Sequence, residues 1–314
     1  MGSRRKFHFL INPVSGGGEG KNVMGFLPEI MDSLGFSRED WLAEFTTPDG
    51  QGQAHAAMLA AEKLIAVGGD GTVSTVLHTL MLDKAYTDVQ IGLIPLGTGN
   101  DLARVLNFYG AYANRGLLYL VRQLVQANSR PFDLWQVNGQ YAMANYFSSG
   151  IDARIAHDFN RDRASGKVMG HSAWANKLHY VRRFWGDRAH RLHLVSLRFR
   201  DENDQWHSKN LSRFRTVIIG NIPSFASGAN PFQDSNMADG LLEIVPVKHL
   251  FRFLGGVGMG QHFVRYLLPS DHAREIILEL SESEYLQLDG EDLTGKLGNR
   301  IHITYAGQAQ LLAL

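Results

Sequence analysis

Short apolar runs recur three times in the first third of the chain, each followed by a glycine-rich turn. Phe7–Ile11, Leu64–Val67 and Ile91–Ile94 have the length and apolar character of buried strands. Helical spacing of apolar residues follows the first two turns, at Val23, Phe26, Leu27, Ile30, Met31 and Leu34, and then at Val73, Val76, Leu77, Leu80 and Met81. Strands that alternate with helices indicate an α/β domain with a parallel sheet and helices on both faces.

The three turns are the first candidates for a functional site. Asn12–Gly18, Gly68–Thr72 and Pro95–Asn100 contain proline or closely spaced glycines, which break regular structure. They follow strands of one parallel sheet, and such sheets bind ligands at the carboxyl ends of their strands. Glycine lets backbone N–H groups approach a phosphate closely, and a helix N-terminus adds donors. The sequence therefore predicts a phosphate site, with Asn100 as the N-cap of a helix that begins at Asp101.

Asp70 lies within the second turn and suggests a metal. No turn matches the P-loop pattern, and none matches the dinucleotide pattern cleanly. A carboxylate beside bound phosphates would be repelled unless a cation lay between them. We therefore expect Mg²⁺ to bridge Asp70, directly or through water, to the oxygens of ATP. The alternative is a tight Asp70-Gly71 turn at a helix N-terminus.

The pattern changes after a helix expected over 114–126. Asn138-Gly139 is a strong signal for a two-residue hairpin. The expected strands are Phe132–Val137, Gln140–Tyr146, Leu192–Arg200, Phe214–Gly220, Leu241–Val247, Ile276–Leu280 and Tyr285–Leu288. The second part is therefore expected to be a mainly antiparallel β-sandwich with a helical insertion around Ala173–Trp185. The predicted domains are 1–128 and 129–314, and the last strand is free to return to the first domain.

Composition narrows the possible classes of function. Net charge is zero, which argues against a nucleic-acid-binding protein. The absence of cysteine excludes thiol catalysis and disulfides, and no apolar run reaches the length of a membrane span. Residues 151–200 nevertheless hold eleven Lys and Arg against four Asp and Glu, a patch suited to an anionic membrane or to a solvated face. Aromatic residues accompany these charges at Trp174–Trp185 and occur again at Phe251–Leu254, and both stretches suit a membrane surface or a core equally.

Taken together, the segments resemble the diacylglycerol kinase family. Asn12–Gly16, Gly68–Thr72 and Pro95–Arg104 resemble the three signature segments of its catalytic domain, in order. Asn145–Ala153, Asp239–Leu242 and Leu288–Glu291 resemble its later motifs, and the resemblance covers roughly residues 7–305. It implies an ATP-dependent lipid kinase with an α/β domain, a β-sandwich domain and an active site in the cleft between them.

The resemblance also assigns roles to residues. It places Asp70 beside the ATP phosphates and metal, and Glu291 as the general base that takes the proton of the lipid hydroxyl. Asp152 is implied on the substrate side. The implied nucleotide-binding residues are Asn12, Ser15, Gly16, Gly68, Gly69, Asp70, Gly71, Thr72, Gly97, Thr98, Gly99 and Asn100. The residues alone leave an alternative for Glu291, which is a solvated edge after an Asp289-Gly290 hairpin turn.

Some positions depart from the family pattern. A structural Mg²⁺ site is implied at Asp239 and the Leu241 carbonyl, but Asn236 stands where a third, acidic ligand is expected. An amide brings no charge, so this metal should bind weakly or be absent unless Asp234 compensates. Ser74-Thr75 and His78-Thr79 replace the usual Asn-Glu and Asn-Gly pairs, and the chain between His55 and Leu64 looks short.

The resemblance and the composition together give the expected partners. We expect a lipid acceptor, an anionic membrane surface and a cytoplasmic, peripherally membrane-associated location, without nucleic acid. The oligomeric state stays open, a homodimer included. Two alternatives remain, a soluble kinase related to NAD kinases and a nucleotide- or lipid-binding regulator without turnover.

Overall fold

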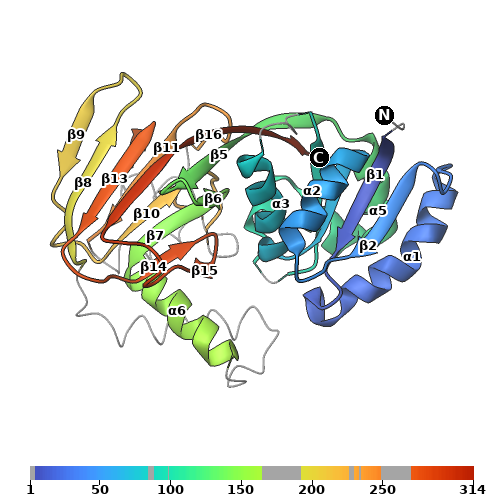
Figure 1. Ribbon diagram of the computed structural model, residues 1–314, viewed down its shortest axis with the longest axis horizontal. Coiled ribbons are helices and arrows are strands. Elements are labelled where there is room, and N and C mark those ends of the chain that lie inside the picture. Colours follow the sequence, from blue (N-terminus) through green and yellow to red (C-terminus); the bar gives the residue numbers. More distant parts are fainter. Residues whose placement is uncertain are drawn as a thin grey trace. The chain divides into compact units, whose positions relative to one another are not determined.

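The chain forms two compact units. The structure, a computed structural model, describes residues 4–83, 88–97, 99–164, 192–225, 230–232, 235–248 and 270–314. The first unit comprises Met1–Leu134 and Ala306–Leu314, and the second comprises Trp135–Tyr305 (Figure 1). The end of the last strand thus belongs to the same unit as the N-terminal part of the chain.

The first unit is built on a parallel sheet, as the strand and helix pattern predicts. Its first four strands run in the order β2-β1-β3-β4, and the end of β16 pairs in parallel beside β4. The strands are β1 (Arg5–Ile11), β2 (Trp41–Phe45), β3 (Ala61–Gly68), β4 (Gln90–Pro95) and β16 (Arg300–Leu312). In this register Phe9 lies between Ala43 and Ile65. Every residue from Phe7 to Ile11 is buried, which is typical of a sheet covered on both faces.

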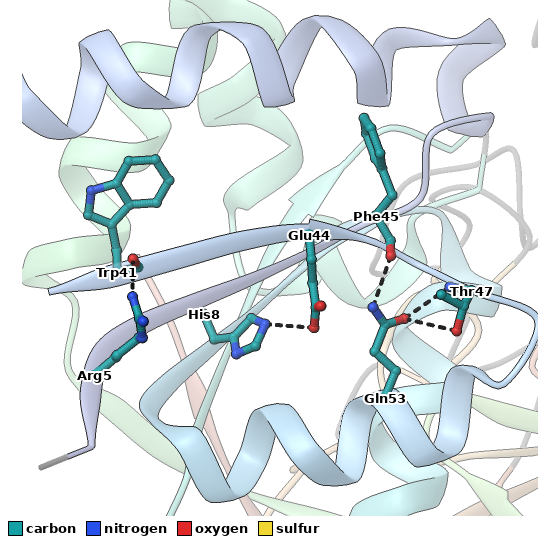
Figure 2. A network of polar contacts seen from close by, with 7 residues as sticks. All are labelled: Arg5, His8, Trp41, Glu44, Phe45, Thr47 and Gln53. Atoms are coloured by element: carbon teal, nitrogen blue, oxygen red, sulfur yellow. Dashed lines mark hydrogen bonds and ion pairs between the residues drawn. The ribbon is translucent and has the colours of Figure 1, made fainter. Parts of the chain in front are cut away.

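Helices provide that cover. They are the 3₁₀ helix η1 (Ser15–Gly17) and the α-helices α1 (Glu19–Ser33), α2 (Gly50–Ala60), α3 (Asp70–Leu82), α4 (Asp101–Val105) and α5 (Phe108–Gln126). α2 and α3 pack together against β3, whereas α1 contacts β1 and α5. Figure 2 shows α1 and α2 on opposite faces of the β1–β2 pair. Within α1, Val23 and Leu27 are buried as predicted, but Phe26 is 57% exposed because it lies at the edge of the apolar stripe.

The sequence pattern does not predict the helix α2, because its signal is weak. Its buried residues Ala54, Ala57 and Met58 are mostly small, so they form no conspicuous apolar stripe. The helix ends at Ala60 and β3 begins at Ala61. The short segment between His55 and Leu64 is therefore a junction of helix and strand without a loop.

The second unit is mainly antiparallel, as predicted. Its strands form one sheet in the order β12-β11-β10-β7-β14-β15 and another that contains β9, β8, β13 and the beginning of β16. The elements of this part are β5 (Ser129–Val137), β6 (Tyr141–Met143), β7 (Tyr146–Gly150), α6 (Ile151–Ala164), β8 (Leu194–Arg200), β9 (Trp206–Lys209), β10 (Thr216–Gly220), β11 (Leu242–Val247), β12 (Asp271–Ala273), β13 (Glu275–Leu280), β14 (Leu286–Leu288) and β15 (Glu291–Asp292). The Asn138-Gly139 hairpin is confirmed, with positive φ at both residues and a 3.0 Å hydrogen bond from Gln140 N–H to Val137 C=O.

An apolar core formed by described residues packs between the two sheets of this unit. Trp135, Phe147, Phe199, Ile244 and Ile303 belong to it, and they come from strands of both sheets. Among the helices described, none is long and apolar enough to cross a membrane. The helix predicted around Ala173–Trp185 and the Phe251–Leu254 stretch lie outside the described residues.

Candidate functional site

The three glycine-rich segments converge at the carboxyl ends of β1, β3 and β4. A Cβ added at Gly97 would lie 2.7 Å from Cα of Gly69, and one added at Gly16 would lie 2.8 Å from the carbonyl oxygen of Leu96. The N–H of Leu96 donates a 2.8 Å hydrogen bond to the carbonyl of Gly68. Only residues without side chains permit backbones to pack this closely. The predicted proximity of the three segments is therefore present within the first unit.

Asn12 fixes the first segment to the second. Its Nδ2 donates to Oγ1 of Thr72 over 3.3 Å, and its Oδ1 accepts a 3.1 Å hydrogen bond from Val14 N–H. The chain then enters η1, where Gly16 has a φ of 63°. Gly20 brings α1 against this turn, because a Cβ there would lie 2.1 Å from the Asn12 carbonyl oxygen. The segment is thus shaped by side-chain hydrogen bonds and by close backbone contact.

Asp70 begins α3 and points toward the third segment. Its Oδ2 accepts a 2.8 Å hydrogen bond from Asn100 N–H. Burial and, to a lesser extent, the nearby charge of Asp101 raise the pKa of the Asp70 carboxyl, while hydrogen bonds from Asn100 and Asp101 lower it, and together they bring this pKa to about 6. A shifted pKa in a glycine-rich turn marks a candidate functional group. A bound cation would favour the ionised form of this carboxylate.

The third segment wraps around this carboxylate. A Cβ added at Gly99 would lie 2.5 Å from Asp70 Oδ2, so glycine is required for the approach. Helix α4 begins at Asp101 as predicted, but Asn100 is in the left-handed region and its side chain makes no capping bond. Instead, Nδ2 of Asn100 donates to the Gly97 carbonyl and Nε of Arg104 donates to the Gly99 carbonyl over 3.0 Å. Thr98 lies outside the described residues.

A pocket of about 470 Å³ adjoins the first two segments. Its lining residues are Leu10, Asn12, Thr46, Thr47, Pro48, Asp49, Gly50, Gln51, Ala54, Gly71, Thr72, Thr75 and Val76. Sequence reasoning missed the part from Thr46 to Gln51, although Pro48-Asp49-Gly50 is a turn signal. In the described lining, Asp49 is the only residue that carries a charge. This pocket therefore suits an uncharged part of a ligand better than its phosphates.

Thr75, one of the positions that depart from the resembled family pattern, is one of the lining residues. Its hydroxyl donates a 3.1 Å hydrogen bond to the Gly71 carbonyl, one turn earlier in α3. The hydroxyl is thus bonded to the backbone of its own helix, and Thr75 brings no charge to the pocket.

In the second unit, two acidic residues that are close in sequence have different surroundings, Asp289 within the Asp289-Gly290 turn and Glu291 directly after it. Asp289 is buried and accepts hydrogen bonds from the N–H groups of Ala144, Asn145 and Tyr146 over 2.8, 2.8 and 2.9 Å. Glu291 follows the turn on β15 and is exposed. The turn is a hairpin, since Leu288 lies opposite Glu291 in the β14–β15 pair. Asp289 is therefore a structural clamp, and Glu291 is accessible to solvent.

Asp152 is buried in the first turn of α6. Its Oδ2 accepts a 2.8 Å hydrogen bond from the hydroxyl of Ser148 on β7. The side chain is thus oriented by the sheet of the second unit.

At the predicted structural metal site, the side chains accept hydrogen bonds from nearby backbone N–H groups. Oδ1 of Asp239 accepts a hydrogen bond of 3.0 Å from Leu241 N–H, and Oδ1 of Asn236 accepts one of 3.2 Å from Ala238 N–H. These side chains therefore shape the turn before β11, and Asp234 lies outside the described residues. In the part of the chain that is described, no three His, Asp or Glu side chains gather as a metal site. The assignment of Asp239, Leu241 and Asn236 stays a prediction.

Asp70 by itself still fits Mg²⁺. Magnesium bound with a nucleotide takes one or two protein carboxylates, and phosphate oxygens and water complete its coordination. A lone carboxylate within a glycine-rich cradle is consistent with that requirement.

Comparison with known proteins follows the same division of the chain. The α/β unit with its glycine-rich site and the antiparallel β unit that follows it are each matched by a separate family model. The family model "Diacylglycerol kinase catalytic domain" matches residues 6–137, and "Diacylglycerol kinase accessory domain" matches residues 142–292. The chain belongs to the diacylglycerol kinase family.

The relatives are distant in sequence. Human diacylglycerol kinase zeta is 25% identical over 96% of this chain and 35% of its own length. The eye-specific diacylglycerol kinase of Drosophila melanogaster is 28% identical over 75% of this chain and 18% of its own length. The chain thus spans about a third or less of these relatives. A crystal structure of a Bacillus anthracis diacylglycerol kinase covers 100% of this chain and 99% of its own, with a TM-score of 0.69 at 17% identity, which supports the fold.

Proposed function

We propose that this protein is an ATP-dependent lipid kinase that transfers the γ-phosphoryl group of ATP to a hydroxyl of a diacylglycerol-like lipid. The observation that carries the proposal is the convergence of three glycine-rich segments around Asp70 in a chain of this family. Phosphoryl transfer depends mainly on positioning and on neutralising charge, and this arrangement supplies groups for both.

The phosphates would lie against the glycine-rich segments. The close packing of Gly97 against Gly69 brings two of these segments together without side chains between them, and the N-termini of α3 and α1 would add N–H donors. Mg²⁺, when bound with ATP, supplies the positive charge that offsets the phosphates. Asp70 would hold that cation and keep it at the start of α3.

The rest of the nucleotide would occupy the pocket beside these segments. Its volume of about 470 Å³ suits a small ligand, and its wall from Thr46 to Gln51 carries hydroxyl and amide groups. Base and ribose are the uncharged parts of ATP, so they fit a described lining in which Asp49 is the only charge.

The second unit would provide the acceptor side. Glu291 is exposed, so it is accessible to a lipid hydroxyl, and we assign it the role of general base by family resemblance. Asp152 is buried and oriented by Ser148, which suits a group that positions the substrate. We further propose that the protein acts from the cytoplasm at an anionic membrane surface, where its acceptor resides.

Two other functions compete with this one. The match of residues 142–292 to the accessory domain favours a lipid kinase over an NAD kinase. A regulator without turnover is motivated by Thr75, which supplies no carboxylate beside the cradle.

The decisive experiment combines the protein with Mg²⁺ and γ-labelled ATP. Separate reactions contain a total lipid extract, NAD or no acceptor, and Asp70→Asn serves as the inactive control. Labelled lipid that depends on Asp70 supports the proposal and identifies the acceptor. Label in NAD alone would replace the lipid assignment, and ATP binding without any labelled product would favour the regulator.

A further inference from the structure

The wall of the pocket is a short stretch of chain between β2 and α2. It leaves the sheet at Thr46, whose N–H donates a 2.8 Å hydrogen bond to the carbonyl of Ile11. It ends at Asp49, whose Oδ1 accepts from Gly52 N–H over 3.1 Å and caps α2. Between these anchors, Thr47 and Pro48 line the pocket. The pocket's shape on this side therefore depends on what holds Thr47 in place.

The side chain of Gln53 links α2, which follows that stretch, to the residues at the start of the stretch. Nε2 of Gln53, on the first turns of α2, donates a 2.9 Å hydrogen bond to the carbonyl of Phe45. Its Oε1 accepts a 2.9 Å hydrogen bond from Thr47 N–H, and Oγ1 of Thr47 lies 3.5 Å away. Figure 2 shows the Gln53 amide reaching from α2 to the end of β2 and to Thr47.

The chemistry of glutamine suits this position. A primary amide carries a donor and an acceptor on one planar group, so it can bind a carbonyl and an N–H at once. Glutamate would keep the acceptor and lose the donor, and methionine would lose both at nearly the same size. Because Gln53 is only partly buried, water can replace these bonds when it is removed. The expected consequence is a less ordered wall in a folded protein.

We propose that Gln53 is a positioning residue that sets the Thr46–Asp49 wall for the nucleoside part of a nucleoside triphosphate. The inference rests on the proposed ATP site. The side-chain hydrogen bonds of Gln53 described above go to Phe45 and Thr47, and none of them reaches the glycine-rich segments that would hold the phosphates. Gln53 should therefore affect recognition of the nucleoside and leave recognition of the triphosphate unchanged.

The test compares two probes, Mg·ATP and Mg·tripolyphosphate, by calorimetry on the whole chain. Gln53→Met should weaken Mg·ATP binding about 5–20-fold, the equivalent of one or two hydrogen bonds. Tripolyphosphate, which lacks the nucleoside, should bind within about twofold of the wild type. Gln53→Glu, which keeps the Thr47 bond, should lie between the wild type and Gln53→Met. Gln126→Met on α5, an exposed glutamine outside the pocket, is the matched control.

Kinetics provide a second measurement. In lipid phosphorylation, Gln53→Met should raise the KM for ATP while kcat and the KM for lipid stay within about twofold. Equal weakening of ATP and tripolyphosphate would mean general damage to the site and would overturn the inference, as would unchanged ATP binding. A wild-type protein that binds tripolyphosphate but not ATP would overturn the proposed function itself. If the wild type binds ATP and the Gln53→Met variant binds it equally well, only the role of Gln53 is overturned.

Discussion

The N–H of Asn100 donates a 2.8 Å hydrogen bond to Oδ2 of Asp70, which connects the segment after β4 with the N-terminus of α3. The two residues are 30 positions apart in the chain. The bond holds a carboxylate inside the glycine-rich cradle, where burial raises its pKa to about 6. A charged group kept in an unfavourable environment is typical of a functional site.

Asp70→Asn should therefore stabilise the fold at alkaline pH. The raised pKa means that ionisation of Asp70 costs the folded state free energy as pH rises from 3.8 to about 6, and the full cost persists above pH 6. After allowance for the partial exposure of Asp70, we expect the free energy of unfolding of Asp70→Asn to exceed that of the wild type by about 1–2 kcal/mol at pH 8. At pH 4 the two free energies should differ little. Urea unfolding at both pH values measures this. A variant less stable than the wild type at pH 8 would contradict the burial argument.

The same substitution should remove Mg²⁺-dependent binding of ATP. Asparagine brings no charge to the cation, so most turnover should be lost as well. In the wild type, Mg²⁺-dependent ATP affinity should weaken below about pH 6 as Asp70 takes up a proton. ATP titrations with and without Mg²⁺ across this pH range test whether Asp70 binds the cation. A Mg²⁺-dependent ATP affinity that does not change with pH would show that Asp70 does not bind it.

Gly97→Val tests the cradle directly. Any Cβ at residue 97 meets the Gly69 backbone at 2.7 Å, so two of the three segments must move apart. We expect ATP binding to fall by at least about 100-fold, equivalent to 2.7 kcal/mol, in a protein that retains its far-UV circular dichroism spectrum. Gly110→Val in α5, where an added Cβ meets nothing within 4 Å, is the control for a glycine substitution. Unchanged ATP affinity in a folded Gly97→Val protein would refute the assignment.

Glu291→Gln separates catalysis from binding. A general base acts only during transfer, so the variant should lower kcat by about 10²–10⁴-fold while ATP affinity stays unchanged. Steady-state lipid phosphorylation and ATP titration measure the two effects, with Glu202→Gln as an exposed control in the same unit. If Glu291→Gln turns over normally, Glu291 is only the exposed residue after a hairpin turn, and Asp70 and Asp152 become the next candidates for the base.

Asp289→Asn should destabilise the second unit. Its carboxylate accepts from three backbone N–H groups in the stretch that leads into β7, and an amide must place N–H donors against some of them. We expect a loss of about 2–4 kcal/mol in the free energy of unfolding, since hydrogen bonds to charged groups are strong and buried donors would be left unpaired. Urea unfolding compares it with the exposed Glu282→Gln. A loss below about 0.5 kcal/mol, the usual effect of a surface change, would show that the clamp is dispensable.

Binding to vesicles tests the proposed membrane surface. Residues 151–200 carry an excess of basic residues, and exposed charges are screened by salt. Association with anionic vesicles should weaken as salt rises, and reversal of Arg182 and Arg183 to Glu should weaken it at low salt. Cosedimentation with neutral vesicles is the control, and equal binding to both kinds would indicate a solvated face.

Local patterns were enough to predict much of this fold. β1, β3 and β4 are short apolar runs, each followed by a glycine-rich segment, and Asn138-Gly139 forms the predicted hairpin turn. These features depend on residues adjacent in sequence, so periodicity and turn chemistry reveal them. The parallel order of the sheet follows from the alternation of strands and helices. Helix α2 was missed because its buried face consists largely of alanine.

The details of the site required contacts between distant parts of the chain. The sequence identified Asp70 and the glycines around it, but the pKa of Asp70 depends on desolvation and on Asn100. Asp289 lies in a segment that resembles a family motif, yet its carboxylate accepts hydrogen bonds from backbone N–H groups up to 145 residues away. The Thr46–Asp49 wall and its bond to Gln53 carry no motif at all. Burial and hydrogen-bond geometry arise only when the strands and helices pack, and so the tertiary structure alone decided which polar groups face the pocket and which support the fold.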